Sequence, residues 1–343
     1  MLTIDEIEKL PFVFIVGKGR SGTTLLKTIF DSHPNVIIPF ESRILIHLKK
    51  KYLHVNNWTV SVIDEFITDL YLDKEFKNYW DVDKVLLRQT INSYPINELT
   101  FAIICKIVYL SYRSPFPKQK IMLIGNKKPL YSIFLDELHK IYPNTKYIHL
   151  IRDYRDNIIS SKHALGQNDI AISAQRWVMH NLKIEKFKAK YPEKFFTVRY
   201  EDLAADPKKY VPELCRFLSI SYNEELYDFH LKTTDLYKNK KNDNEMINYL
   251  ANKNHLNLMN PINTSRVDKW KSEMNAEELE ISEYIAGELG EKYNYKRITH
   301  ERKLKYLFIS WKANLKTMAN NLITITFFNL PFSIRKKMSS MVK

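Results

Sequence analysis

The sequence predicts an α/β fold with a mostly parallel sheet flanked by helices, a helical insertion and a basic C-terminal helical tail. Short apolar runs rich in β-branched and aromatic residues alternate along the chain with segments of helical periodicity. The first run leads directly into a glycine-rich turn, although only 7 of the 343 residues are glycine. Strands that alternate with helices pair in parallel, because each helix carries the chain back to the same end of the sheet.

Four apolar runs are predicted to form buried strands, because each is short and bounded by turn residues. They cover residues 12–16, 121–124, 146–151 and 195–199, and a strand-like stretch follows at 36–40. Helical spacing of apolar residues follows each of the four runs. It predicts helices over 25–31 and 130–141, from about 155 onward, and over 207–218.

Three segments fall outside this alternation. Residues 42–120 contain helical patterns, many tyrosines and tryptophans and no convincing strand, which predicts an inserted helical region that shapes a pocket. Residues 238–254 are polar and rich in asparagine, which is typical of a loop. We expect one domain over 1–295, insertion included, followed by a basic tail over 296–343.

Charge and cysteine content exclude several classes of protein. The net charge is +14, of which residues 296–343 contribute +10, so the body is nearly balanced and does not resemble a uniformly basic nucleic-acid binder. Cys105 and Cys215 show no paired spacing, which excludes a disulfide framework and a cysteine zinc site and fits a reducing compartment. The acidic N-terminus does not read as a signal peptide, and no apolar run reaches the length of about 18 residues that a membrane helix needs. We therefore expect a cytoplasmic protein that does not bind nucleic acid.

The glycine-rich turn, residues 17–24 (GKGRSGTT), has the features of an anion-binding loop. Glycines let backbone N–H groups converge on an anion, and the helix that follows adds a partial positive charge. The spacing matches the opening of a P-loop, but Thr23 stands where nucleoside triphosphatases have lysine, and the cation is Arg20 instead. A P-loop kinase or nucleotide hydrolase remains the alternative, and magnesium-dependent ATP turnover would identify it.

Four motifs, in order along residues 10–275, resemble those of the PAPS-dependent sulfotransferases, with the bacterial branch and the tyrosylprotein enzymes most alike. Residues 16–26 (VGKGRSGTTLL), followed by DSHPNV and Glu41, resemble the 5′-phosphosulfate loop. The other three are IRDYRDNIIS at 151–160, RYEDLAADP at 199–207 and SRVDKW at 265–270. The resemblance implies a P-loop-type sheet and transfer of a sulfuryl group from 3′-phosphoadenosine-5′-phosphosulfate (PAPS) to an acceptor hydroxyl, without a metal.

The resemblance also implies which residues bind the donor. The loop would hold the 5′-phosphosulfate, and Arg152 with Ser160 would hold the 3′-phosphate. From the residues alone, Arg152 could instead pair with Asp153 or Asp156, and Trp177 could pack in the core or stack on adenine. The full set of implied donor-binding residues is Gly19, Arg20, Ser21, Gly22, Thr23, Thr24, Arg152, Ser160, Tyr200, Ser265, Arg266 and Lys269.

Arg20, Glu41 and Lys127 are the implied catalytic residues. Arg20 would bridge the phosphosulfate and Lys127 would contact the sulfuryl group. Glu41, in an ExR element ending at Arg43, would be the base, with a pKa raised by desolvation against its apolar neighbour. Two alternatives stay open: His33 as the base, and an ion pair between Glu41 and Arg43. Lys128 stands where the tyrosylprotein enzymes have an acid.

The basic tail predicts an amphipathic helix with a lysine border. Its apolar face comprises Leu304, Leu307, Phe308, Trp311, Leu315 and Met318. Such a helix packs on the domain or docks on an anionic membrane, and the charge favours the membrane, at its cytoplasmic face. We expect the acceptor hydroxyl to lie on a glycan or glycolipid, with a peptide tyrosine or small metabolite as the alternative. A non-enzymatic protein that binds through its tail is a third hypothesis.

Overall fold

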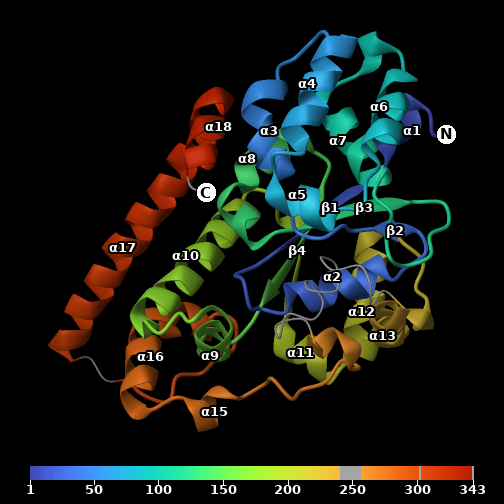
Figure 1. The fold of residues 1–343 in the computed structure, drawn as a ribbon. Helices are drawn as coiled ribbons and strands as arrows, with labels where there is room; N and C mark the ends of the chain where they lie inside the picture. The colour runs from blue at the N-terminus through green and yellow to red at the C-terminus, as the bar shows by residue number, and fades with distance from the viewer. Residues whose placement is uncertain (240–255, 301–302, 342–343) are drawn as a thin grey trace.

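The computed structural model describes residues 1–239, 256–300 and 303–341. Its centre is a five-stranded parallel sheet with helices on both faces (Figure 1), which confirms the predicted fold class. The strand order is β2-β3-β1-β4-β5, so β1 lies between the two strands whose carboxyl ends carry the later motifs. The strands are β1 (Phe12–Val16), β2 (Val36–Ile37), β3 (Leu123–Lys127), β4 (Lys146–Ile151) and β5 (Phe195–Arg199).

The second long strand differs from its prediction. It was expected over 121–124, but β3 begins at Leu123 and runs through the polar residues Asn126 and Lys127, while Met122 is half exposed. Apolar periodicity cannot detect this part because its polar side chains are satisfied inside the fold: Asn126 bonds the hydroxyl of Tyr109. The register pairs Lys127 with Ile15, so the lysine stands at the carboxyl edge beside the glycine loop.

The sheet divides the core into two layers, because successive side chains of a strand point to opposite faces. Val13 and Ile15 of β1 pack against α2 (Thr23–Asp31), α11 (Tyr200–Ala205) and α12 (Pro207–Leu218). Phe12 and Phe14 face the helical insertion on the other side. The central strand is therefore fully buried, which explains its unbroken apolar sequence.

The segment between β2 and β3 is helical throughout, as predicted. Its elements are α3 (Ile44–Tyr52), α4 (Val60–Leu70), α5 (Lys74–Tyr79), α6 (Lys84–Asn92), η1 (Ile96–Glu98) and α7 (Phe101–Leu110). The other helices are α1 (Ile4–Lys9), η2 (Pro129–Ile133), α8 (Leu135–Ile141), α9 (Tyr154–Leu165), α10 (Ile170–Lys188), η3 (Pro192–Lys194), η4 (Glu224–Asp228), α13 (Phe229–Asn239), η5 (Leu256–Met259), α15 (Trp270–Glu273) and α16 (Ala276–Glu291). The loop predicted over 238–254 lies, apart from the last residues of α13, outside the described residues.

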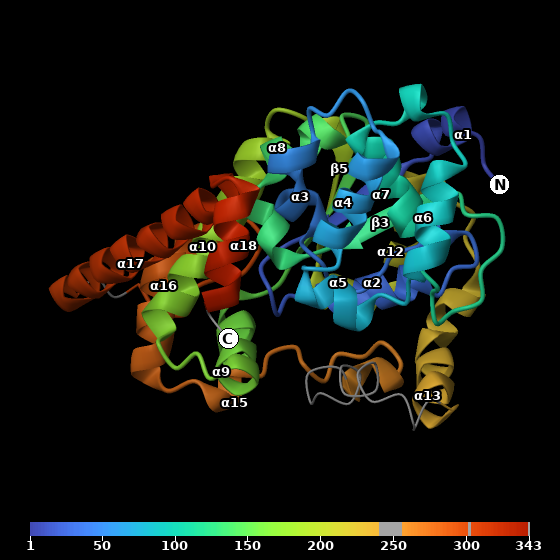
Figure 2. The same cartoon turned by 45° about the horizontal axis from the view of Figure 1, so that its top comes forward.

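The basic tail forms two helices, α17 (Leu304–Asn329) and α18 (Phe332–Met341). Figures 1 and 2 show α17 along the outer side of α10. It buries Tyr306, Ala313, Thr317 and Phe328, while the predicted apolar face points away from the domain. Within the described ranges, no helix combines the length and the hydropathy that crossing a bilayer requires.

Candidate active site

The glycine loop joins β1 to α2 at the carboxyl edge of the sheet, and two of its glycines are required by close packing. A Cβ on Gly17 would lie 2.3 Å from the carbonyl oxygen of Leu150 in β4. Gly22 has φ +89° and a Cβ there would lie 2.5 Å from the ring of Tyr200, so a larger residue would be strained and would clash. The loop is thus pressed against the end of β4 and the start of α11.

Arg20 connects the loop to the end of β4 and to α9. Its Nε donates to the hydroxyl of Ser160 at 3.2 Å, and its carbonyl oxygen accepts from Arg152 at 3.1 Å. Its backbone has φ +74°, a strained conformation for a residue with a side chain. The three residues predicted for the two anion sites therefore meet, although they are 132 or more positions apart along the chain, counted from Arg20.

Asn157 holds the loop in place, and sequence reasoning missed it. Its buried side-chain amide donates to the carbonyl oxygen of Gly19 at 2.9 Å and to the hydroxyl of Ser21 at 3.0 Å. The only sequence signal was an asparagine on a helix that otherwise turns apolar residues inward. Gly19 and Ser21 are thereby positioned by α9 and do not line the pocket described below.

We expect Asn157→Leu, a substitution of similar volume, to lower the free energy of unfolding by about 1–3 kcal/mol, because it leaves the loop acceptors unpaired. Urea denaturation would measure this change. Ser161→Ala is the matched control, since the Ser161 hydroxyl bonds only a carbonyl of its own helix. An equal loss in both variants would show that Asn157 does not act through the loop.

A cleft with an empty volume of about 840 Å³, which includes space open to solvent, lies beside the loop. No acidic residue is among its described lining residues, whereas three guanidinium groups are, those of Arg20, Arg152 and Arg266. Burial, and then the neighbouring Arg152 and Arg266, lower the pKa of Arg20. The Nε of Arg152 is buried and has no hydrogen-bond partner within the described residues, so the cleft presents unneutralised donors to an anion. Of the residues predicted to bind the donor, those that line the cleft are Arg20, Gly22, Thr23, Thr24, Arg152, Ser160, Tyr200, Ser265 and Arg266.

Two other candidates lie outside this cleft. Lys269 is exposed at the start of α15 and does not line the cleft. Trp177 is fully buried, and its indole N–H donates to the carbonyl oxygen of Arg152 at 2.9 Å. Trp177 therefore supports Arg152 from behind as a packing residue.

Lys127 and Glu41 meet at the first turn of α2. The ammonium group of Lys127 donates to the hydroxyl of Thr24 at 2.9 Å and contacts the carboxylate of Glu41. Lys128 lies 3.1 Å from the other carboxylate oxygen and also pairs with Glu75. A buried base candidate, its lysine and a loop hydroxyl thus share one corner of the site.

The expected rise in the pKa of Glu41 is wrong. Burial does raise it, but Lys127 and then Lys128 outweigh burial and lower the pKa of Glu41 to about 2. The sequence could not show this, because both lysines come from the end of β3, 86 positions from Glu41 in the case of Lys127. Glu41 is therefore ionised and ion-paired at neutral pH.

The two alternatives for the base do not survive the geometry. Both ring nitrogens of His33 are engaged: Nε2 donates to the carbonyl oxygen of Ser221 at 2.9 Å and Nδ1 accepts from the N–H of Asn35 at 3.0 Å. His33 is a packing residue at the end of α2. Arg43 faces Asp73 and Glu75, each at 3.7 Å, and not Glu41.

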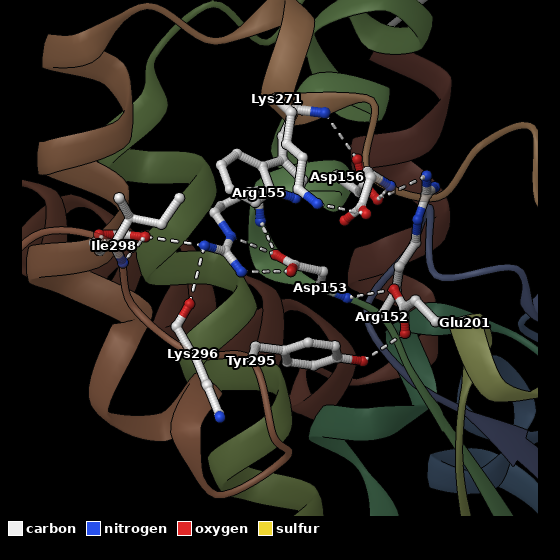
Figure 3. A network of polar contacts seen from close by, with 12 residues as sticks. Arg152, Asp153, Arg155, Asp156, Glu201, Lys271, Tyr295, Lys296 and Ile298 are labelled. Atoms are coloured by element: carbon white, nitrogen blue, oxygen red, sulfur yellow. Dashed lines mark hydrogen bonds and ion pairs between the residues drawn. The ribbon is translucent and has the colours of Figure 1, made fainter.

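A polar network fixes the end of β4 and the turn at 265–270 (Figure 3). Asp153 pairs with Arg155 at 2.7 Å, and Arg155 reaches Glu283 at 2.9 Å. Asp156 accepts from the N–H groups of Asp268 and Trp270, at 2.9 and 3.0 Å. Because Asp153 is occupied and Asp156 is 4.0 Å away, the Arg152 guanidinium turns to the carbonyl oxygens of Arg20 and Arg266.

Comparison with known proteins agrees with this arrangement. Protein-tyrosine sulfotransferase 1 of Danio rerio is 26% identical over 63% of this chain and 55% of the relative, and the Drosophila melanogaster protein-tyrosine sulfotransferase is 22% identical over 76% and 47%. The chain thus spans about half the length of the curated relatives it matches.

Two solved structures share the fold. The sulfotransferase domain of the Synechococcus PCC 7002 olefin synthase matches with a TM-score of 0.55 at 22% identity, covering 83% of this chain and 95% of that domain. The sulfotransferase domain of the curacin biosynthetic pathway matches with a TM-score of 0.51 at 22% identity, covering 82% and 97%. The model of the sulfotransferase family matches residues 11–224, which include the glycine loop, Glu41, Lys127 and Arg152. This chain belongs to the sulfotransferase family.

Proposed function

We propose that this protein transfers a sulfuryl group from PAPS to an acceptor hydroxyl. The observation that carries the proposal is the acid-free cleft in which Arg20, Arg152 and Arg266 converge beside the glycine loop. PAPS has a phosphosulfate on one side of its ribose and a phosphate on the other, so it needs two clusters of cationic donors. Nine of the twelve donor-binding residues expected from the sequence line this one cleft.

The loop and the first turn of α2 would hold the phosphosulfate, with the hydroxyls of Thr23 and Thr24 and the guanidinium of Arg20 as donors. Arg152 and Ser160 would hold the 3′-phosphate, with Ser265 and Arg266 at the rim. Tyr200, which stacks on Arg152 at 4.9 Å, would limit the base pocket, and Lys269 would add charge nearby.

The reaction needs in-line positioning and charge stabilisation rather than covalent catalysis. The acceptor oxygen forms a bond to sulfur while the bond from sulfur to the bridging phosphate oxygen breaks. Its electron pair stays on the phosphate, so that 3′,5′-adenosine bisphosphate (PAP) leaves. Arg20 would stabilise the charge on the leaving oxygen. The acceptor proton passes to Glu41.

Glu41 can do this only if its ion pair is loosened, because a carboxylate with a pKa of about 2 is a weak base. Lys127 is the group that can change partners. Once its ammonium turns from the carboxylate to a sulfuryl oxygen, burial is less opposed and the pKa of Glu41 rises. The lysine would thus both contact the sulfuryl group and activate the base.

We expect Lys127→Met to change the pH profile as well as the rate. In the wild-type free enzyme Glu41 stays ionised down to pH values near its lowered pKa, so kcat/KM should show no acid limb from this group above about pH 5. Removal of Lys127 raises the pKa of Glu41, so an acid limb should appear at higher pH. Lys127→Arg should keep the wild-type profile. An unchanged profile in Lys127→Met would show that this lysine does not control Glu41.

The acceptor hydroxyl is proposed to lie on a glycan or glycolipid, with a peptide tyrosine or small metabolite as the alternative. The surface of α17 supports a lipid-linked acceptor. Its apolar face is unpartnered within the described chain, with Leu304 82%, Phe308 66% and Trp311 56% exposed. Lys312 and Lys316 border this face, and residues 304–343 contain no acid, which suits an anionic membrane surface.

We expect the protein to float with vesicles of phosphatidylcholine containing anionic phosphatidylglycerol, and not with vesicles of phosphatidylcholine alone. Reversing Lys312 and Lys316 to glutamate should remove most of the binding, because each basic residue near an anionic surface contributes about 1 kcal/mol. Lys186→Glu, an exposed position on α10, is the control. Equal flotation with both vesicles, or no effect of the double reversal, would contradict the proposal.

The function itself is tested by two measurements. Calorimetry should show binding of PAP, and a protein that does not bind PAP would overturn the proposal. Incubation with sulfur-labelled PAPS and a lysate separated into glycan, lipid and peptide fractions should label the glycan or lipid fraction. Label in the peptide fraction alone would select the tyrosine alternative, and magnesium-dependent ATP turnover without sulfuryl transfer would select the kinase or hydrolase.

A further inference from the structure

Lys18 is a buried lysine without a partner, next to the glycine loop. Four lysines are classed as buried in the described chain, and the other three are satisfied. Lys27 pairs with Asp31 at 2.8 Å and Lys127 pairs with Glu41. The third, Lys106, donates to three carbonyl oxygens, those of Ile7, Glu8 and Leu10. Lys18 is only 8% exposed, and its ammonium group forms no hydrogen bond or ion pair with a described residue.

The neighbours of Lys18 are cations. Burial, followed by Arg176 of α10 and then Arg20, lowers the pKa of Lys18 to about 8. No acidic group offsets this effect, and a pKa of about 8 still leaves Lys18 mostly charged at neutral pH. Lys18 and Arg176 both contribute to lowering the pKa of His180, so the three side chains form one cluster. Burying like charges together is unfavourable unless an anion joins them.

The cluster adjoins the corner where sulfuryl transfer is proposed. The ring of His180 bonds the hydroxyl of Ser132 in η2, which begins two residues after Lys127. The same 3₁₀ helix packs on the glycine loop, since a Cβ on Gly19 would lie 3.7 Å from Pro129. Arg20 interacts electrostatically both with Lys18 and with Glu41. The walls of the cluster are therefore the loop, η2 and α10.

The donor does not account for these charges. Neither Lys18, Arg176 nor His180 lines the cleft assigned to PAPS, and that cleft already contains three arginines for the two phosphates. The Arg176 side chain, like that of Lys18, has no ion-pair partner within the part of the chain that the structure describes. The acceptor is the remaining substrate at this corner.

We propose that Lys18 and Arg176 bind an oxyanion carried by the acceptor, such as a carboxylate or a phosphate, and so select acidic acceptors. This inference rests on the proposed sulfuryl transfer. The oxyanion neutralises a pair of cations that the empty protein leaves unbalanced, and it anchors the acceptor while its hydroxyl reaches Glu41. His180, hydrogen-bonded to Ser132, orients the α10 wall as a positioning residue.

The test uses two matched pairs of acceptor probes that differ in one charge. The first pair is 4-nitrophenyl β-glucuronide and 4-nitrophenyl β-glucoside, and the second is 4-hydroxyphenylacetate and 4-hydroxyphenylacetamide. Calorimetry on the PAP-saturated full-length protein should show at least about tenfold tighter binding of the anionic member in at least one pair, in line with the strength of charge-assisted hydrogen bonds. Equal affinity for the two members of both pairs, or no binding of either anion, would overturn the inference.

Lys18→Met removes the charge and keeps the length of the side chain. We expect it to abolish the preference for the anionic probe, while Lys18→Arg restores it and the control Lys186→Met leaves it unchanged. The melting temperature of Lys18→Met should equal or exceed that of the wild type, because an unpartnered buried charge is removed. A preference that persists in Lys18→Met, or a lower melting temperature, would show that Lys18 has a structural role. PAP binding is measured separately: anion preference without PAP binding would overturn the proposed function but not the anion site.

Discussion

Replacing Arg20 with alanine should reduce kcat/KM for sulfuryl transfer by about 10²–10³-fold, the usual effect of removing one preorganised donor from a developing charge. Arg20 is the loop cation nearest both anion sites, since its guanidinium bonds Ser160 and its carbonyl oxygen receives Arg152. The charge that moves to the leaving phosphate oxygen would lose its closest guanidinium. Steady-state kinetics with labelled PAPS would measure the loss.

The backbone at Arg20 allows catalysis to be separated from folding. With φ +74°, alanine keeps the strain of a left-handed residue, whereas glycine removes it. Arg20→Gly should therefore be as inactive as Arg20→Ala but at least as stable in thermal unfolding. Activity near the wild-type level in either variant would remove the loop cation from the mechanism, and Arg20→Lys should retain part of the rate because it keeps a charge.

Replacing Glu41 with glutamine should lower kcat by about 10²–10⁴-fold, the range for loss of a general base, and leave the affinity for PAP nearly unchanged. Glutamine fills the same space but cannot take the acceptor proton. It also deprives the buried Lys127 of its carboxylate, whose attraction partly offsets the lowering of the pKa of Lys127 by burial. The pKa of Lys127 should fall further in this variant.

Glu75→Gln is the matched control for Glu41→Gln. Glu75 also pairs with Lys128, but it does not contact Lys127. We expect a small effect on kcat from this control. A comparable loss in both variants would mean that the carboxylates act only by holding Lys128, and a collapse of PAP affinity in Glu41→Gln would show that Glu41 belongs to the donor site and is not the base.

Local sequence patterns predict most of the sheet because burial of a parallel strand leaves a continuous apolar run. The strands β1, β4 and β5 occur where their apolar residues predict them. The pattern fails at β3, where Asn126 and Lys127 are buried and satisfied by partners from other elements. It also separates the tail from the domain, whereas α17 in fact buries one face against α10 and leaves the predicted apolar face outside.

The site shows the same division. Residues within one motif, such as those of the glycine loop, can be assigned from a resemblance because their spacing is local. Asn157 could not be recognised, since its function depends on reaching Gly19 and Ser21 from another helix. The direction of the Glu41 pKa depends on whether burial or the lysines prevail, and only the positions of Lys127 and Lys128 decide that.

The amino-acid sequence alone determined the fold class, the order of the motifs and the kinds of chemical group available to them, because these follow from composition and local spacing. Tertiary structure decided which of those groups meet. The order β3-β1-β4 brings the carboxyl ends of three strands to one edge, and with them Lys127, the glycine loop and Arg152. It also decided which charges are neutralised, leaving Lys18 without a partner in the described chain, because burial and distance between remote residues are properties of the packed molecule and not of the chain order.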